Sequence, residues 1–249
     1  MPLVSPNSIA LLRWPKAGST AAESMLRSIP IEWNDEGEHH GFELQEMGPE
    51  PLVLTTCRHP VDWYASWLAH VLDSPADWPL LSTWSGGLIE PADVSRVPLI
   101  QMIEWTMPLL LSPPPWACQH PASSPIFTPS GIHPDLKAAL TEGSLWQACA
   151  RVYAQHATHV VPQERLVEGL GLLFTNMEIP PRFSRKSKTR PIIREYLSYW
   201  GDLIWEADGP MASSLGYTSG SNPIPESALL LDSEIAWPRA AKLTTAAER

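Results

Sequence analysis

A short apolar run, a tight glycine-containing loop and a helical pattern follow one another near the start of this sequence, and this order strongly limits the possible fold. Ser8–Trp14 is apolar enough for a buried strand and ends at Pro15. Residues 20–29 then place apolar side chains at the i, i+3, i+4 and i+7 positions of one helix face. Thr20 and Glu23 have the spacing of a capping box, so we expect the helix to begin at or beside Thr20.

The same order of strand and helix recurs twice. Pro51–Cys57 reads as a second buried strand, and Pro60 suits the first turn of the helix after it. His159–Val161 reads as a third strand, followed by a helix from Glu164 to about Phe174. Strands separated by helices predict an α/β fold with a central parallel sheet and helices on both faces. Ligands of such sheets bind at the carboxyl ends of the strands.

The rest of the chain is assigned more coarsely. We expect one α/β domain over residues 1–217 and a loosely packed C-terminal tail over 218–249. Residues 73–130 are rich in proline and tryptophan and read as a helical insertion or lid over the core. Further helices are expected over 99–111, over 135–156 and from Pro191 to about Ala207, and residues 30–50 are expected to be loop.

Charge and cysteine content exclude some classes of protein. The formal net charge is −10, so the composition is not that of a nucleic-acid-binding protein, and any anion site must be a local basic feature. The cysteines are Cys57, Cys118 and Cys149, an odd number without a C-x-x-C pair, which argues for reduced thiols and against a disulfide framework or a zinc site. With no signal peptide and no long apolar run in the sequence, we expect a cytoplasmic protein without a membrane span.

The loop Pro15–Thr20 has the composition of an anion site. It links a strand to a helix N-terminus, where unpaired N–H groups and the helix dipole favour an anion. Gly18 permits close approach of the backbone, and Lys16 adds a positive charge. The loop is not a Walker A motif, because Ser19 stands where that motif has its lysine. An ordinary loop with a chance lysine remains the alternative.

Two further groups of residues have the chemistry to hold a phosphate. Arg58 follows the second strand, and Ser66 lies about two turns along the next helix, so both can reach one phosphate. The alternative is a structural arginine and an ordinary helical serine. Residues 182–194 hold six of the 17 basic residues and no acidic residue. This segment is either a solvated loop or an anion clamp.

These elements together resemble the sulfotransferases that use 3′-phosphoadenylyl sulfate (PAPS), in particular the carbohydrate and Golgi-type branch and its bacterial relatives. Pro15–Thr20 is similar to the family's P-K-x-G-[ST]-T phosphosulfate loop, and Arg58-His59-Pro60 with Ser66 is similar to its R-x-P…S element for the 3′-phosphate. Val160–Leu166 resembles the later strand with its E-x-L, and Tyr199–Tyr217 resembles the closing Y-x-x-D…G-Y helix. The resemblance implies a P-loop-like three-layer α/β/α fold.

The resemblance also implies a reaction and a set of site residues. A sulfuryl group would pass from PAPS to a hydroxyl or amine acceptor, with a carbohydrate as one candidate, leaving PAP, and no metal would be required. Lys16 would stabilise the leaving oxygen, and His40, then His39, is favoured as general base over Glu43 and Glu46. The donor would be held by the following residues: Lys16, Ala17, Gly18, Ser19, Thr20, Arg58, Ser66, Arg185, Lys186, Ser187 and Lys188.

Acceptor and activity class stay open at this level. The acceptor is expected to be a small molecule or glycan, and several tryptophans near the expected cleft can stack on it, although core packing is the commoner use. These are Trp63, Trp67, Trp78, Trp84, Trp105 and Trp116. A P-loop-type kinase of nucleotides or small molecules, and an inactive PAP-binding protein of the sulfotransferase type, are the two alternatives. The sequence does not indicate an oligomeric state.

Overall fold

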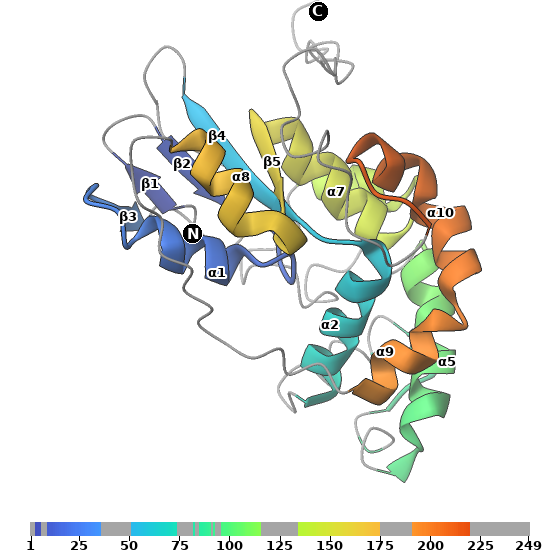
Figure 1. Cartoon of the computed structure of the whole chain (residues 1–249). Coiled ribbons are helices and arrows are strands. Elements are labelled where there is room, and N and C mark those ends of the chain that lie inside the picture. The colour runs from blue at the N-terminus through green and yellow to red at the C-terminus, as the bar shows by residue number, and fades with distance from the viewer. Residues whose placement is uncertain are drawn as a thin grey trace, which may run out of the picture.

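The strands of the molecule form one five-stranded mixed sheet with the order β3-β1-β2-β4-β5 (Figure 1). The computed structural model describes residues 3–5, 9–35, 51–73, 82, 85–90, 92, 96–115, 134–174 and 191–219. The strands are β1 (Leu3–Ser5), β2 (Ile9–Leu12), β3 (Asn34–Asp35), β4 (Leu52–Cys57) and β5 (His159–Pro162). The fold is therefore α/β, as the sequence predicts.

The three strands predicted from apolar runs are β2, β4 and β5, and they are parallel neighbours. Leu11 pairs with Leu54, and Leu54 in turn pairs with His159. The prediction of a purely parallel sheet is wrong at one edge, because β1 pairs antiparallel with β2 and β3 pairs antiparallel with β1. A connection as short as residues 6–8 cannot cross over the sheet, so β1 and β2 must run in opposite directions.

Helices flank the strands in the order that the sequence predicts. Their bounds are α1 (Ser19–Leu26), α2 (Pro60–Asp73), α5 (Leu99–Leu111), α6 (Pro134–Leu140), α7 (Leu145–His156), α8 (Leu166–Leu173), α9 (Pro191–Ser198) and α10 (Gly201–Ser214). A short 3-10 turn, Gln163–Arg165, links β5 to α8. Within these described ranges, no helix combines the length and the apolar character needed to cross a membrane.

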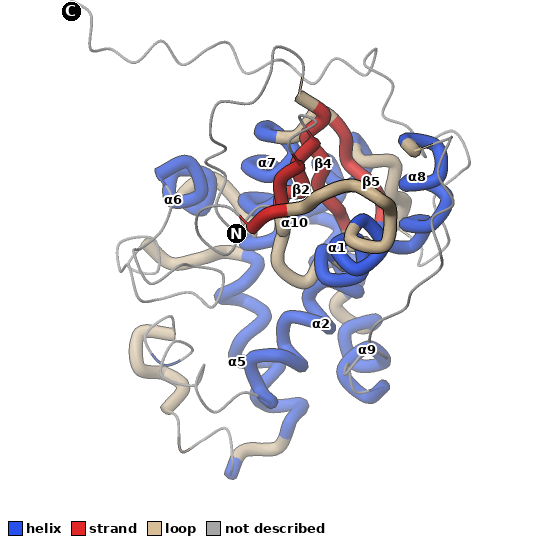
Figure 2. The backbone as a smooth tube through the Cα atoms, turned by 90° about the vertical axis from the view of Figure 1, so that its left-hand side faces the viewer, coloured by secondary structure: helices blue, strands red, loops and turns tan. Residues whose placement is uncertain are grey.

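The two faces of the sheet are covered by different helices. Ala10 and Leu12 of β2 face a core built with α2, α5, α7, α9 and α10, whereas Leu11 faces a smaller core built with α1 and α8. In Figure 2 the strands lie between α7 on one side and α1 and α8 on the other. Alternate residues of each strand thus bury their side chains on opposite faces, which explains why the strands read as continuous apolar runs.

Three local predictions about helices need correction. The predicted capping box between Thr20 and Glu23 does not form. Helix α1 begins at Ser19 after Gly18, and Glu23 pairs with Arg13 at 2.9 Å. The helix expected over 135–156 is two helices, since the Ser144 side chain accepts a hydrogen bond from the Gln147 N–H and starts α7. The helix expected from Pro191 to Ala207 breaks after Ser198, where a turn leads into Gly201, a poor helix former.

Helix α5 is the longest described element of the proline-rich region. It packs against the main core through buried Met102, Ile103, Met107 and Leu110. Its predicted range, 99–111, is confirmed. Half of residues 73–130 lie outside the described part of the chain, so the insertion or lid stays a prediction.

A buried carboxyl group joins α2, α7 and α10. Asp208 of α10 is fully buried, and it accepts a hydrogen bond from the Ser144 hydroxyl group at the start of α7. The Tyr64 hydroxyl group of α2 and the Cys149 thiol of α7 are the neighbouring titratable groups. Burial raises the pKa of Asp208 from its ordinary value of 3.8 to about 7, although the hydrogen bonds from Ser144 and Tyr64 oppose the shift.

This raised pKa predicts a pH-dependent stability. The folded state holds the Asp208 proton more tightly than the unfolded state, so the stabilisation is complete below about pH 3.8 and is lost as the pH rises through about 7. A difference of about three between the two pKa values corresponds to about 4 kcal/mol. We therefore expect the free energy of unfolding of Asp208→Asn, relative to the wild type, to increase by up to that amount from pH 4 to pH 8.

Urea unfolding at a series of pH values measures this difference. Glu206→Gln, which removes an exposed carboxylate from the middle of the same helix, is the matched control for the loss of a charge. A difference for Asp208→Asn that does not change with pH would show that Asp208 ionises alike in the folded and unfolded states.

Candidate functional site

The loop between β2 and α1 turns sharply at two residues. Lys16 has φ 62° and Gly18 has φ 88°, and Lys16 is the one non-glycine residue with positive φ in the described part of the chain. A lysine in this conformation stores local strain, a feature that clusters at functional sites. Helix α1 begins directly after, at Ser19. The N–H groups of Gly18, Ser19 and Thr20 make no hydrogen bond with another described residue, so they are donors for an anion.

Side chains from other elements hold this loop in place. The indole N–H of Trp63 in α2 donates to the Pro15 carbonyl at 2.7 Å. The preceding residue, Trp14, is fully buried and stacks on Tyr153 of α7 with ring centroids 6.0 Å apart. The loop is thus fixed by α2 and α7 before any ligand binds, which is the preorganisation that a tight anion site requires.

Gly18 is also the point where the loop meets the end of β5. A Cβ atom built at Gly18 would lie 2.5 Å from the Cγ atom of Gln163, a distance at which two carbon atoms clash. Position 18 therefore needs glycine for two reasons, the positive φ and the side chain of Gln163. This contact brings together the carboxyl ends of β2 and β5.

Arg58 follows β4 and extends toward the loop. Its guanidinium group is buried, with 8% of the residue exposed, and its Nη1 atom donates to the Lys16 carbonyl at 3.4 Å. Trp146 donates its indole N–H to the Arg58 carbonyl at 3.1 Å. Burial lowers the pKa of Arg58, while the carboxylates of Asp62 and Glu164 act in the opposite direction. A buried cation beside free N–H groups attracts an anion.

Ser66 lies on the partly exposed side of α2, one turn after Asp62. Arg58 and Ser66 do not contact each other through a hydrogen bond in the structure. Arg194 of α9 forms an ion pair with Asp62 at 2.7 Å, which places the described end of the basic segment beside α2. Arg58, Ser66 and Arg194 are thus arranged around the first two turns of this helix.

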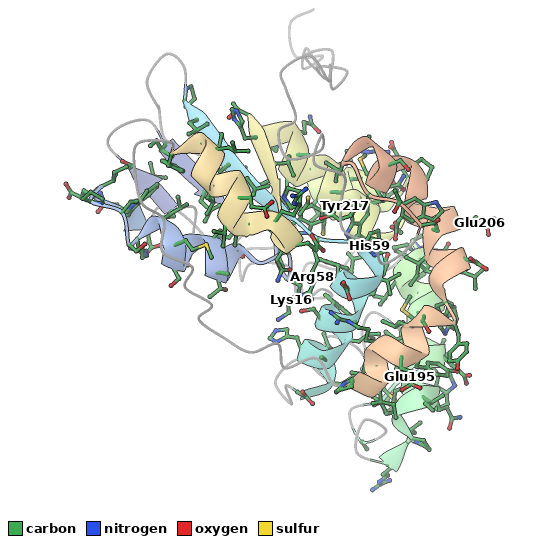
Figure 3. The ribbon with its side chains drawn as sticks, viewed as in Figure 1. Lys16, Arg58, His59, Glu195, Glu206 and Tyr217 are labelled. Carbon is green, nitrogen blue, oxygen red and sulfur yellow. The ribbon has the colours of Figure 1, made fainter. Side chains whose placement is uncertain are left out.

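The sequence did not predict a group of contacts around the end of β4. One Glu164 oxygen accepts a hydrogen bond from the His59 N–H, and the other accepts from the Tyr217 hydroxyl group, both at 3.0 Å. The same Tyr217 hydroxyl lies 3.2 Å from the Cys57 sulfur atom. Figure 3 shows Lys16, Arg58, His59 and Tyr217 close together, whereas Glu195 and Glu206 lie apart on α9 and α10. The E-x-L and G-Y patterns contain Glu164 and Tyr217 but do not indicate that the two meet.

The remaining predicted site residues have different outcomes. Ala17, Ser19 and Thr20 lie in the loop and the first turn of α1, as predicted. His39 and His40, proposed as general bases, and Arg185, Lys186, Ser187 and Lys188 lie outside the described residues. Trp63 and Trp67 are buried in the core and are not free to stack on an acceptor, and Trp105 of α5 is partly exposed. Within the described residues, no three histidine, cysteine or acidic side chains lie close enough to hold a metal ion.

The candidate site lies at the carboxyl ends of three parallel strands, and its chemistry suits an anion. It offers backbone N–H groups, one partly buried lysine and one buried arginine, with Gln163 and Glu164 beside them. Comparison of the chain with models of protein families, with curated proteins and with solved structures finds no match. The function must therefore be argued from the site alone.

The geometry of Gly18 predicts the effect of one substitution. Gly18→Ala should lower the free energy of unfolding by about 1–3 kcal/mol, because it strains the backbone and pushes the loop from Gln163. Gly171→Ala in α8 is the control, since a Cβ atom there meets nothing within 4 Å and φ is not positive. It should stabilise the protein by up to about 1 kcal/mol. Urea unfolding measures the free energy of unfolding of both variants. An equal change in the two variants would contradict the proposed role of Gly18.

Proposed function

We propose that this protein is a sulfotransferase that uses PAPS as its donor. The observation that carries the proposal is the hydrogen bond from Arg58 to the Lys16 carbonyl, because it joins the two elements that resemble the family's 5′-phosphosulfate and 3′-phosphate sites. Parallel strands β2 and β4 supply the two elements, and helices cover both faces of the sheet, which agrees with a P-loop-like three-layer fold.

The residues present suit the two charged ends of PAPS. The free N–H groups of Gly18, Ser19 and Thr20 suit the 5′-phosphosulfate, as other helix N-termini suit phosphates. Arg58, with Ser66 on the adjacent helix, suits the 3′-phosphate through charge-assisted hydrogen bonds. The buried state of Arg58 makes a bound phosphate more favourable, because the anion replaces solvation that the guanidinium group has lost.

The proposed reaction transfers one sulfuryl group in line. The acceptor oxygen forms a bond to sulfur while the bond from sulfur to the 5′-phosphate oxygen of PAP breaks. Negative charge develops on that leaving oxygen, and the ammonium group of Lys16 stabilises it, a contribution of about 3–4 kcal/mol for one such contact. The proton of the acceptor hydroxyl group passes to a general base, for which His40 and His39 remain the candidates.

Binding of PAP tests the proposal directly. We expect PAP to bind in calorimetry and to raise the melting temperature, and AMP, which lacks the 3′-phosphate, to bind at least about tenfold more weakly. Absence of PAP binding would reject the proposal. Binding of ATP with Mg²⁺ in place of PAP would favour a kinase, and PAP binding without transfer to any acceptor tested would favour an inactive binding protein.

Because Lys16 has a strained backbone, substitutions there allow effects on ligand binding and on stability to be measured separately. Lys16→Gly removes the ammonium group and also relieves the positive φ, so we expect PAP to bind at least about tenfold more weakly, while the free energy of unfolding stays within about 1 kcal/mol of the wild type. Lys16→Ala should weaken PAP binding to the same extent, but it should not relieve the backbone strain, because alanine keeps a Cβ atom.

Arg151→Ala, which removes an exposed cation from α7, is the control for the loss of positive charge and should bind PAP normally. Calorimetry and urea unfolding measure the two effects. Wild-type PAP affinity in Lys16→Gly would show that the lysine does not contact the nucleotide.

A further inference from the structure

Glu164, directly after β5, contacts the segment that carries Arg58. We propose that Glu164 is a positioning residue, which fixes the backbone around Arg58 and so directs the guanidinium group toward a 3′-phosphate. The inference rests on the proposed function, since it assigns to Glu164 a role in binding that donor. Glu164 itself need not touch the ligand.

The contacts of Glu164 bracket Arg58 on both sides. His59, the next residue, donates its backbone N–H to one carboxylate oxygen at 3.0 Å. Cys57, the residue before, lies 3.2 Å through its sulfur atom from the Tyr217 hydroxyl group, and this hydroxyl donates to the other carboxylate oxygen at 3.0 Å. Residues 57 and 59 are therefore tied to the same pair of side chains, Tyr217 and Glu164.

The segment after α10 completes this arrangement. The His59 ring lies edge-on to Tyr217, with centroids 5.6 Å apart, and stacks near Trp205 of α10 at 6.1 Å. Its Nε2 atom is 3.1 Å from the Thr218 carbonyl oxygen. Tyr217 is buried, so its hydroxyl group has little freedom to choose another partner. The backbone after β4 is thus held from β5 and from the end of α10 at once.

The site has a reason to need this restraint. Arg58 is buried and donates to the Lys16 carbonyl at 3.4 Å, a long hydrogen bond that by itself fixes the side chain weakly. A small rotation of the backbone at residue 58 would move the guanidinium group away from a bound phosphate. Bidentate contacts of arginine with phosphate require a defined orientation, so a fixed backbone favours binding.

Charge alone predicts the opposite effect. Glu164 is an anion near a site for anions, so its removal would strengthen phosphate binding if electrostatic repulsion dominated. Positioning, in contrast, requires only hydrogen-bonding groups in the right place. An amide keeps one oxygen to accept from the His59 N–H, and its amino group can donate to the Tyr217 hydroxyl oxygen, whereas a methyl group can do neither. Glu164→Gln and Glu164→Ala therefore separate the two explanations.

Calorimetry of the full chain with PAP and with AMP tests the proposal. We expect Glu164→Ala to weaken PAP binding at least about tenfold and AMP binding less than about threefold, and Glu164→Gln to stay within about threefold of the wild type for both. Tyr217→Phe should also weaken PAP binding more than AMP binding. Glu168→Ala, which removes an exposed carboxylate that pairs with Arg165 on the same turn, is the matched control and should bind both ligands normally.

Four outcomes would overturn the proposal. These are wild-type PAP affinity in Glu164→Ala, tighter PAP binding in both Glu164 variants, an equal loss in Glu164→Gln and Glu164→Ala, and an equal loss of PAP and AMP binding. If Glu164→Ala does not fold, Tyr217→Phe replaces it in the test, because this variant removes only one hydroxyl group. The same ratio of PAP affinity to AMP affinity is then measured. Failure of the wild type to bind PAP would instead reject the proposed function, so the two failures are distinguishable.

Discussion

The buried guanidinium group of Arg58 is the constraint on which the arrangement of the site depends. Its charge is not relieved by loss of a proton, because an arginine side chain stays protonated in proteins. The surroundings must therefore supply acceptors and negative charge, and they do so from three strand ends. The Lys16 carbonyl follows β2, Asp62 lies in the helix after β4, and Glu164 follows β5. The parallel order β2-β4-β5 makes this convergence possible.

Asp208 is a second buried ionisable group, and it differs from Arg58 because it can lose its charge. It is also buried, but a carboxyl group with a pKa of about 7 can take up a proton and become neutral. It lies at a junction of α2, α7 and α10, where its hydrogen bond to Ser144 has a packing role. The comparison separates two kinds of buried polar group in one core. Asp208 can become neutral within the structure, whereas Arg58 keeps its charge and has the Lys16 carbonyl and the carboxylates of Asp62 and Glu164 near it.

The sequence predicted the elements whose signal is local and missed those that depend on distant partners. The three parallel strands and helices α1, α2 and α5 were found because each is an uninterrupted apolar run or helical period. Strands β1 and β3 have three and two residues, too few for any period to show. The breaks before α7 and α10 depend on one capping serine and one short turn. The capping box failed because Glu23 has better partners in Arg13 and Arg27.

The same reasoning applies to the candidate site. Lys16, Gly18 and Arg58 are readable because a loop or a strand end carries each of them within a short motif. Glu164 and Tyr217 become significant only through contacts with distant parts of the chain. Glu164 bonds to His59, which is 105 positions earlier, and Tyr217 contacts Cys57, which is 160 positions earlier. The positive φ of Lys16 has no sequence signal at all, since lysine ordinarily avoids it. In a chain of net charge −10, long-range attraction does not favour an anion, so the proposed binding of PAP requires short contacts whose geometry is held in advance.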